Sequence, residues 1–437
     1  MKKFMLALLC VLLTAGFAVA AEIDFKGMYY ARGSYIDNTN GLSGSDTADY
    51  FYFDHELDIT SRILVTDKTR VIVNFEIHDE DWLTGNTDGR DLNTSDPDDN
   101  IEFKRVFGSH TFDYGGVLET GLMTGGAWMT GFGDNGDGRY RVKYTQPTQI
   151  GPVIGIYEKN DDQGRKNTTT EDAEKDDNTG YYLAMVAKAG NFNIYPLIGY
   201  VDNSADILDL GGDGNDTFRF FLGTDATFGD LGFEAEFNYL STDQDKGSTF
   251  DPTDPDQTDK AALPDDFKRW GLYANGWWNI GAGKVGLLGA YGSWDDDVGS
   301  GFDMGADFTP TIFGADWTAI GGGINNGYAG VSMLQLYGSL AISEQFSING
   351  SALWWGSNAD ENHDGTKNFW KDADGYEINA GLDYKITDAV TYTVAAAFGK
   401  ISLDDDGGAD NFQGRTGVVD DSPDGFVRAY HRFKIDF

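Results

Sequence analysis

The chain has 437 residues, of which 71 are acidic and 32 are basic, giving a formal net charge of −39. This charge argues against nucleic acid as a partner, because phosphate binding requires positive charge. An aromatic content of 14% and 58 glycines exclude an intrinsically disordered acidic chain. A helical membrane protein is also excluded, because no segment after the N-terminus approaches the run of about 20 apolar residues that a transmembrane helix needs.

Residues 1–20 have the pattern of a secretory signal peptide. A start with two lysines and an apolar stretch lead to the small-residue cleavage pattern Ala18-Val19-Ala20. The single cysteine, Cys10, lies inside this segment, so residues 21–437 can form no disulfide. We therefore predict an exported protein whose stability does not depend on disulfides.

Apolar and polar residues alternate in many short segments of residues 21–437, which is the period of β-strands. The last segment places Phe433, Ile435 and Phe437 on one face and charged residues on the other. A terminal aromatic residue that closes such a strand is typical of bacterial outer-membrane barrels, whose apolar side chains face lipid. We expect outer-membrane lipid and lipopolysaccharide to surround the protein, and the barrel-assembly machinery to bind the strand that ends in Phe437.

The connections between these segments fall into two length classes that alternate along the chain. Nine long connections and eight short turns predict 18 strands, with both termini on the side of the short turns. We therefore predict an all-β fold, a transmembrane antiparallel up-and-down β-barrel of the bacterial outer membrane, with short periplasmic turns and long acidic external loops. A barrel of about 16 strands is the alternative. The long connections cover roughly residues 37–49, 80–100, 124–138, 160–178, 203–216, 241–266, 296–327, 359–373 and 403–424.

One segment, 101–112, does not alternate cleanly, because Phe103, Arg105 and Phe107 share a face. The sequence leaves open whether this segment contains a β-bulge or lies on a surface that other protein covers.

Acidic residues concentrate in the long connections, whereas basic residues concentrate at positions expected to face the lumen. Closure of the barrel places the last strand beside the first. Seven of these cations are therefore expected to form one wall: Lys26, Arg32, Arg62, Arg70, Arg428, Arg432 and Lys434. The alternative is an ordinary lumen of mixed charge, since Asp54, Glu56, Asp58 and Glu76 share that wall. The expected lumen-facing basic residues are Lys26, Arg32, Arg62, Arg70, Arg139, Arg141, Arg428, Arg432 and Lys434.

The connection 124–138 contains the stretch from Gly125 to Gly138, GGAWMTGFGDNGDG, which is apolar at first and then acidic at Asp134 and Asp137. A compact loop of this kind can fold into a barrel and narrow it. Acidic residues on the loop, opposite cations on the wall, would create a transverse field that discriminates solutes by size and charge. We therefore expect a constriction loop at 124–138.

Together, the export signal, the terminal phenylalanine, the sorted connections and this loop resemble a bacterial outer-membrane porin. The short stretches Ile23-Asp24-Phe25-Lys26-Gly27 and Ile101-Glu102-Phe103-Lys104-Arg105 are similar to the homotrimeric porins of sulfate-reducing bacteria. The resemblance implies a homotrimer of water-filled diffusion channels. By analogy, the third long loop and the wall arginines Arg32, Arg62 and Arg70 would carry selectivity. An expected count of 18 strands leaves open a solute-specific channel of the larger type.

Other chemistry has little support in the sequence. The five histidines form no ligand pair, and no serine lies in a nucleophile turn, so we expect neither an enzyme nor a cofactor. Calcium bound by loops is a minority hypothesis, because Asp134, Asp137, Asp372 and Asp374 offer closely spaced oxygen ligands beside or near glycines. Solvated acidic loops are the alternative.

The sequence thus predicts a passive diffusion channel for small hydrophilic solutes or ions. Acidic external loops favour cations and basic lumen residues oppose them, so the expected preference is weakly cationic. A solute-specific channel is one alternative. A closed barrel whose loops serve adhesion or surface anchoring is the other.

Overall fold

The structure is a computed structural model. It describes residues 22–37, 50–77, 101–125, 128–133, 138–162, 177–203, 214–245, 266–296, 300–305, 308, 310, 330–360, 371–402 and 425–437. The predicted signal peptide, residues 1–20, lies outside the described residues.

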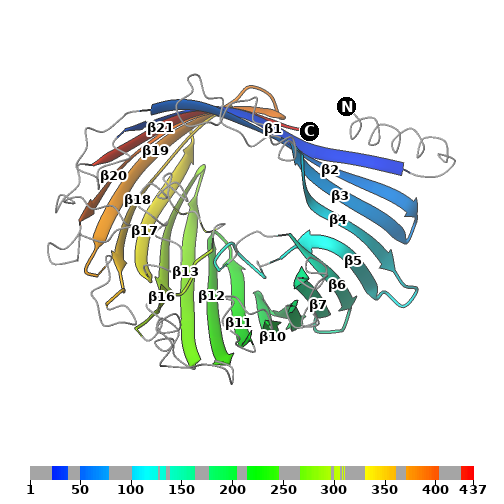
Figure 1. Ribbon diagram of the computed structural model, residues 1–437. Helices are drawn as coiled ribbons and strands as arrows, with labels where there is room; N and C mark the ends of the chain where they lie inside the picture. The colour runs from blue at the N-terminus through cyan, green and yellow to red at the C-terminus, as the bar shows by residue number, and fades with distance from the viewer. Residues whose placement is uncertain are drawn as a thin grey trace, which may run out of the picture.

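The described strands form one closed antiparallel β-barrel (Figure 1). Its sheet has 19 strand segments, but β8 and β9 both pair with β10 and are separated only by Val186, so they count as one strand. The barrel therefore has 18 strands, as the sequence predicts. A separate short hairpin consists of β15 (Trp294–Asp295) and β16 (Ser300–Gly301). The barrel segments are β1 (Glu22–Asp37), β2 (Tyr50–Thr66), β3 (Thr69–Ile77), β4 (Glu102–Thr111), β5 (Val117–Thr124), β6 (Gly138–Gln146), β7 (Val153–Asp162), β8 (Asp177–Met185), β9 (Ala187–Ala189), β10 (Phe192–Asn203), β11 (Gly214–Phe228), β12 (Leu231–Asp245), β13 (Asp266–Ile280), β14 (Gly283–Gly292), β17 (Val331–Ala341), β18 (Phe346–Ser357), β19 (Asp374–Lys385), β20 (Val390–Ser402) and β21 (Phe426–Asp436).

The barrel closes between its first and last strands. β1 pairs with β21 over ten residue pairs, from Met28 opposite Asp436 to Asp37 opposite Val427. The last residue extends this ladder, because the Phe437 amide donates to the Gly27 carbonyl at 2.9 Å and the Gly27 amide donates to the Phe437 carbonyl at 2.8 Å. Closure satisfies the backbone groups of both edge strands, as a barrel in lipid requires.

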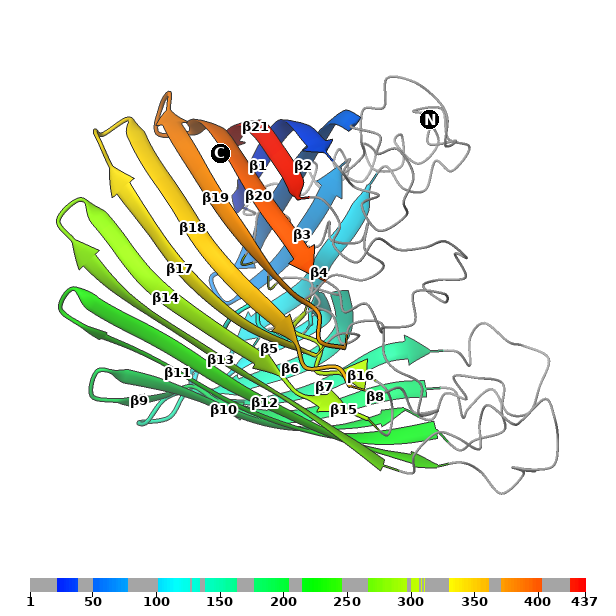
Figure 2. The ribbon, with the colours of Figure 1, turned by 90° about the vertical axis from the view of Figure 1, so that its left-hand side faces the viewer.

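The strands meet at two different ends. Short turns join the strands at one end of the barrel, where β1 begins and β21 ends. The strand ends that lead into the long connections lie at the other end (Figure 2). The alternation of connection lengths in the sequence therefore corresponds to a sorting of connections by side.

Side chains alternate between an apolar outer face and a mixed inner face. On the outer face, large apolar side chains remain exposed: Phe25 by 59%, Leu336 by 56% and Ile378 by 57%. Register places their neighbours Lys26, Gln335 and Glu377 on the inner face. This is the alternation of a barrel that faces lipid outside and water or protein inside. Among the described residues, no helix has the length and hydropathy that a membrane crossing requires.

The irregular segment 101–112 contains a β-bulge. The β3–β4 register shifts between Asn74, which lies opposite Arg105, and Phe75, which lies opposite Phe103. The extra residue, Lys104, allows Phe103 to turn outward, where it is 54% exposed, while Arg105 takes an inward position. Of the two alternatives that the sequence left open, the bulge accounts for the pattern.

One side of the lumen is filled by a hydrophobic cluster. Inward side chains of β13, β14, β17 and β18, such as Tyr273, Met333 and Trp355, pack there against residues of the long connections. Trp355 and Met304 are fully buried in this cluster.

Candidate pore and its constriction

The basic residues predicted for one wall lie on the inner faces of neighbouring strands. In the β1–β21 register, Arg32 is opposite Arg432 and Ile36 is opposite Arg428. In the β1–β2 register, Lys26 is opposite Thr60 and Asp24 is opposite Arg62. Arg70 of β3 occupies the inward position opposite Ser109 of β4. The structure thus brings these cations onto one wall, and their part in selectivity remains a prediction.

Several of these cations are held by neighbours. Arg32 binds Asp54 through two nitrogens, with Nη2–Oδ2 and Nε–Oδ2 distances of 2.6 and 2.9 Å. Arg428 is only 2% exposed and donates to the Tyr52 hydroxyl at 3.1 Å. Arg62 is exposed. Arg62 is therefore better placed than Arg428 to act on a solute in the lumen.

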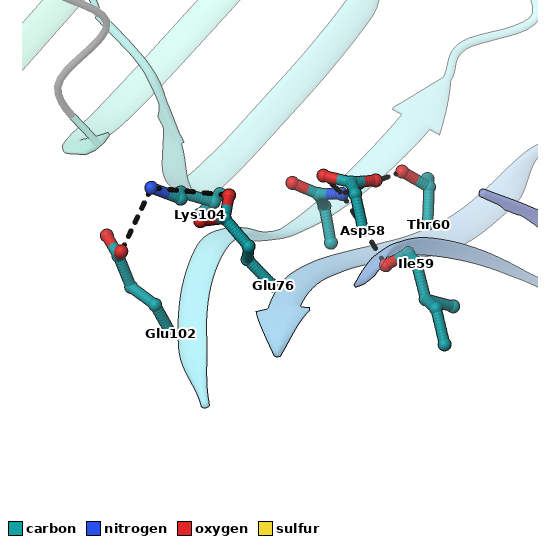
Figure 3. A network of polar contacts seen from close by, with 7 residues as sticks. Asp58, Ile59, Thr60, Glu76, Glu102 and Lys104 are labelled. Carbon is teal, nitrogen blue, oxygen red and sulfur yellow. Dashed lines mark hydrogen bonds and ion pairs between the residues drawn. The ribbon is translucent and has the colours of Figure 1, made fainter. Parts of the chain in front are cut away.

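Acidic residues on the same wall are also engaged (Figure 3). The Asn74 side-chain amide donates to the Asp58 carboxylate at 2.9 Å and to the Thr60 hydroxyl at 2.9 Å. Next to it, Lys104 lies between Glu102 at 2.9 Å and Glu76 at 3.5 Å. These carboxylates give this wall mixed rather than purely basic charge. Each of them is also bonded to a protein donor.

Residues 128–133 of the third long loop pack against inward side chains of the barrel, and a constriction by the whole loop 124–138 stays a prediction. Phe132 is 2% exposed and packs against Tyr273, Phe302 and Phe308, with ring centroids 5.7, 5.4 and 5.2 Å away. The Thr130 amide donates to Glu236 Oε1 of β12 at 2.6 Å. In Figure 1 the cyan trace of this segment lies inside the ring of strands.

A glycine allows the close approach of this loop to the wall. Gly133 has a φ of +76°, and its amide donates to the Met304 carbonyl at 2.6 Å. A Cβ at this position would lie 3.3 Å from Asn238 Nδ2, so a larger residue would crowd the wall. The acidic residues Asp134 and Asp137, predicted to face the cations, lie outside the described residues.

A second segment enters the lumen, and the sequence reasoning missed it. Residues 300–305 and 308 lie within the predicted long connection 296–327, and Phe302, Met304 and Phe308 of this segment are buried in the luminal cluster. The signal was present in the sequence as closely spaced apolar residues in a long connection.

Arg139 and Arg141 of β6 face inward and share one buried carboxylate. Glu158 of β7 is fully buried and lies 2.9 Å from Arg139 Nη1 and 2.5 Å from Arg141. The Tyr182 hydroxyl also donates to Glu158 at 3.3 Å. Two guanidinium groups around one carboxylate leave this group with a net positive charge.

These arginines line a luminal cavity of about 390 Å³ together with Arg219 of β11 and Arg269 of β13. We call it the arginine pocket. Its lining includes Trp128 and Gly133 of the third loop, and Phe302 and Asp303 of the second inward segment. Sequence reasoning missed Arg219 and Arg269, although each alternates with outward aromatic residues such as Phe218 and Trp270.

The calcium hypothesis gains no ligand cluster here. Asp372, with a φ of +62°, and Asp374 lie at the start of β19. Within the described parts of the chain, no group of three or more His, Cys, Asp or Glu residues is arranged to hold a metal ion. The other two candidates, Asp134 and Asp137, are not among those residues.

Comparison with known proteins finds similar folds among solved structures but no similar sequence. The sequence matches no protein-family model and no curated protein sequence. Among solved structures, it resembles OccK2 (OpdF) of Pseudomonas aeruginosa, with a TM-score of 0.53, 9% identity, and coverage of 95% of this chain and 98% of that one. The same protein in complex with glucuronate gives a TM-score of 0.52 and 10% identity, with the same coverage. At such identity the likeness shows the fold alone.

A further similar structure is the outer membrane channel DcaP of Acinetobacter baumannii, with a TM-score of 0.46, 12% identity, and coverage of 96% of this chain and 98% of that one. The barrel fold and the apolar outer face agree with the predicted location in the bacterial outer membrane. The narrower resemblance to porins of sulfate-reducing bacteria stays a prediction.

Proposed function

We propose that the protein is a passive diffusion channel of the bacterial outer membrane for small hydrophilic solutes or ions. The observation that supports this proposal is a closed barrel with an apolar outer face and a charged inner wall, in which Phe132 of the third long loop packs against Tyr273 of β13. A polar inner wall and an apolar outer face are what a water-filled channel in lipid requires.

The proposed selectivity is weakly cationic. The part of the inner wall around Arg32 carries both signs, with the ion pair Arg32–Asp54, so this part favours neither strongly. The strong excess of acidic residues in the long connections would then attract cations to the external entrance. Reversal potential in a salt gradient tests the sign, and a clear anion preference would contradict it.

The resemblance to porins also leads us to propose a homotrimer. The outer face at the β21–β1–β2 seam carries His55 and His431, which are costly in contact with lipid and would be covered at a subunit interface. Crosslinking of the protein in native membranes is expected to yield three-chain species, and a monomer alone would contradict this.

A solute-specific channel is the second candidate, and the arginine pocket favours it, because a general pore needs no pocket in which four arginines converge. A closed barrel with adhesive loops is the alternative that the luminal cluster leaves open. Conductance of the purified protein in a planar bilayer separates these functions. Stepwise current supports a channel, and a folded, inserted barrel without current is a closed one.

A further inference from the structure

The arginine pocket lies in the lumen toward the long-loop end of the barrel. Its strand residues include Thr217 and Phe267 at the start of β11 and β13, Thr242 at the end of β12, and Arg139 and Arg141 at the start of β6. Both inward segments contribute to it through Trp128 and Phe302. A solute that enters from the external side would therefore meet this pocket next to the constriction.

The pocket has a surplus of positive charge. Arg139, Arg141, Arg219 and Arg269 line it, and Asp303 is the acidic residue among the described lining residues. Glu158, bonded behind two of these arginines, compensates one further charge. Arginine matches carboxylates well, because its planar guanidinium donates two parallel hydrogen bonds.

The pocket also has a surplus of hydrogen-bond donors. Trp128 Nε1, Arg219 Nε and Asn238 Nδ2 belong to lining residues and are buried with no acceptor among the described residues. A buried donor without an acceptor is costly, and a ligand that carries acceptor oxygens would relieve that cost. The bond from Arg269 Nη1 to the Gly301 carbonyl is long, at 3.4 Å, so this guanidinium also retains capacity to donate.

The lining also has an apolar part, beside polar residues such as Asn215, Thr217 and Thr242. Ile156, Leu197, Phe221, Leu240, Phe267 and Phe302 surround the charged groups. Phe267 also lies against the Arg269 guanidinium, whose carbon is 4.5 Å from the ring centroid. A small, strongly hydrated inorganic anion would gain nothing from these side chains, whereas an apolar body would be removed from water.

We propose that the arginine pocket binds a small organic carboxylate with an apolar body, an inference that rests on the channel function and names its solute class. The carboxylate would bind the arginines and the donors around Arg219, while the apolar body would lie against the aromatic lining. A volume of about 390 Å³ is within the range of small-molecule sites.

Binding can be measured by saturation-transfer NMR on the folded barrel in detergent, with benzoate as the probe. We expect saturable binding of benzoate. Benzyl alcohol, which lacks the charge, and sulfate, which lacks the apolar body, should compete at least about tenfold more weakly. If benzyl alcohol competed as strongly as benzoate, the site would be an apolar surface without selectivity for a carboxylate. If sulfate competed as strongly, the site would be a general anion site. Either result overturns the proposal.

Two separate variants test the residues. Arg219→Gln and Arg269→Gln should each weaken benzoate binding about tenfold, which is the effect of losing one charge-assisted hydrogen bond. Lys188→Gln, on β9, is the matched control, because it removes one positive charge outside the pocket and should leave affinity unchanged. If either folded pocket variant binds benzoate as tightly as the unchanged protein, the pocket is not the site.

Current measurements separate this proposal from the channel function. Benzoate should reduce single-channel current in a saturable manner with the same half-saturation as in NMR. A barrel that conducts without binding benzoate refutes the pocket alone. A folded barrel that binds benzoate without conducting refutes the channel and leaves the pocket standing.

Discussion

Replacement of Phe132 by alanine should widen the channel. Phe132 is 2% exposed and its ring contacts three aromatic rings, so its truncation should cost the docked loop about 3 to 5 kcal/mol. The described backbone anchors that remain, from Thr130 to Glu236 and from Gly133 to Met304, are two hydrogen bonds with a net value of about 1 kcal/mol each. The ratio of docked to released loop should therefore fall by about 100-fold or more.

Single-channel conductance in a planar bilayer measures this release. Phe132→Ala should conduct more than the unchanged protein and should admit larger neutral polymers. Phe237→Ala is the matched control, because Phe237 lies on the outer face of β12, where it contacts Phe220 and Trp270. Unchanged conductance and size exclusion in Phe132→Ala would refute the constriction by this loop.

Three further results are expected. Glu158→Gln removes the carboxylate shared by two arginines, so it should lower the free energy of unfolding in urea by about 3 kcal/mol. It should also shift the reversal potential toward anion preference. An unaltered unfolding midpoint would contradict the buried charge cluster. Joint neutralisation of Arg32, Arg62 and Arg428 should shift ion preference toward cations, with Arg62→Gln alone giving most of the shift, since Arg428 is buried; equal shifts from all three single variants would contradict that ranking. If calcium holds the external loops, a chelator should speed their cleavage by protease, and identical cleavage patterns would dispose of the calcium hypothesis.

Much of the barrel could be predicted from the sequence, because lipid imposes a strict alternation on every strand. That alternation set the inward positions of residues such as Arg32 and Arg432, and the sorted connections set the strand count. The irregular segment around Phe103 was recognisable as a departure from the pattern, but only the register between β3 and β4 identified a bulge.

The interior was harder to predict, because alternation says which way a side chain points and not what fills the lumen. Inward apolar residues such as Met333 and Trp355 are buried by a connection that returns into the barrel, a contact distant in sequence. The sequence did not single out Arg219 and Arg269. They form a candidate site only because the two inward segments complete a pocket that they line together with Arg139 and Arg141.

The most direct test of a water-filled passage is the conductance of the purified, folded protein in a planar bilayer, combined with a series of neutral solutes of increasing size. We expect discrete current steps, together with a size above which solutes no longer enter and reduce the current. Insertion of heat-modifiable, folded barrels without any current steps would contradict the channel.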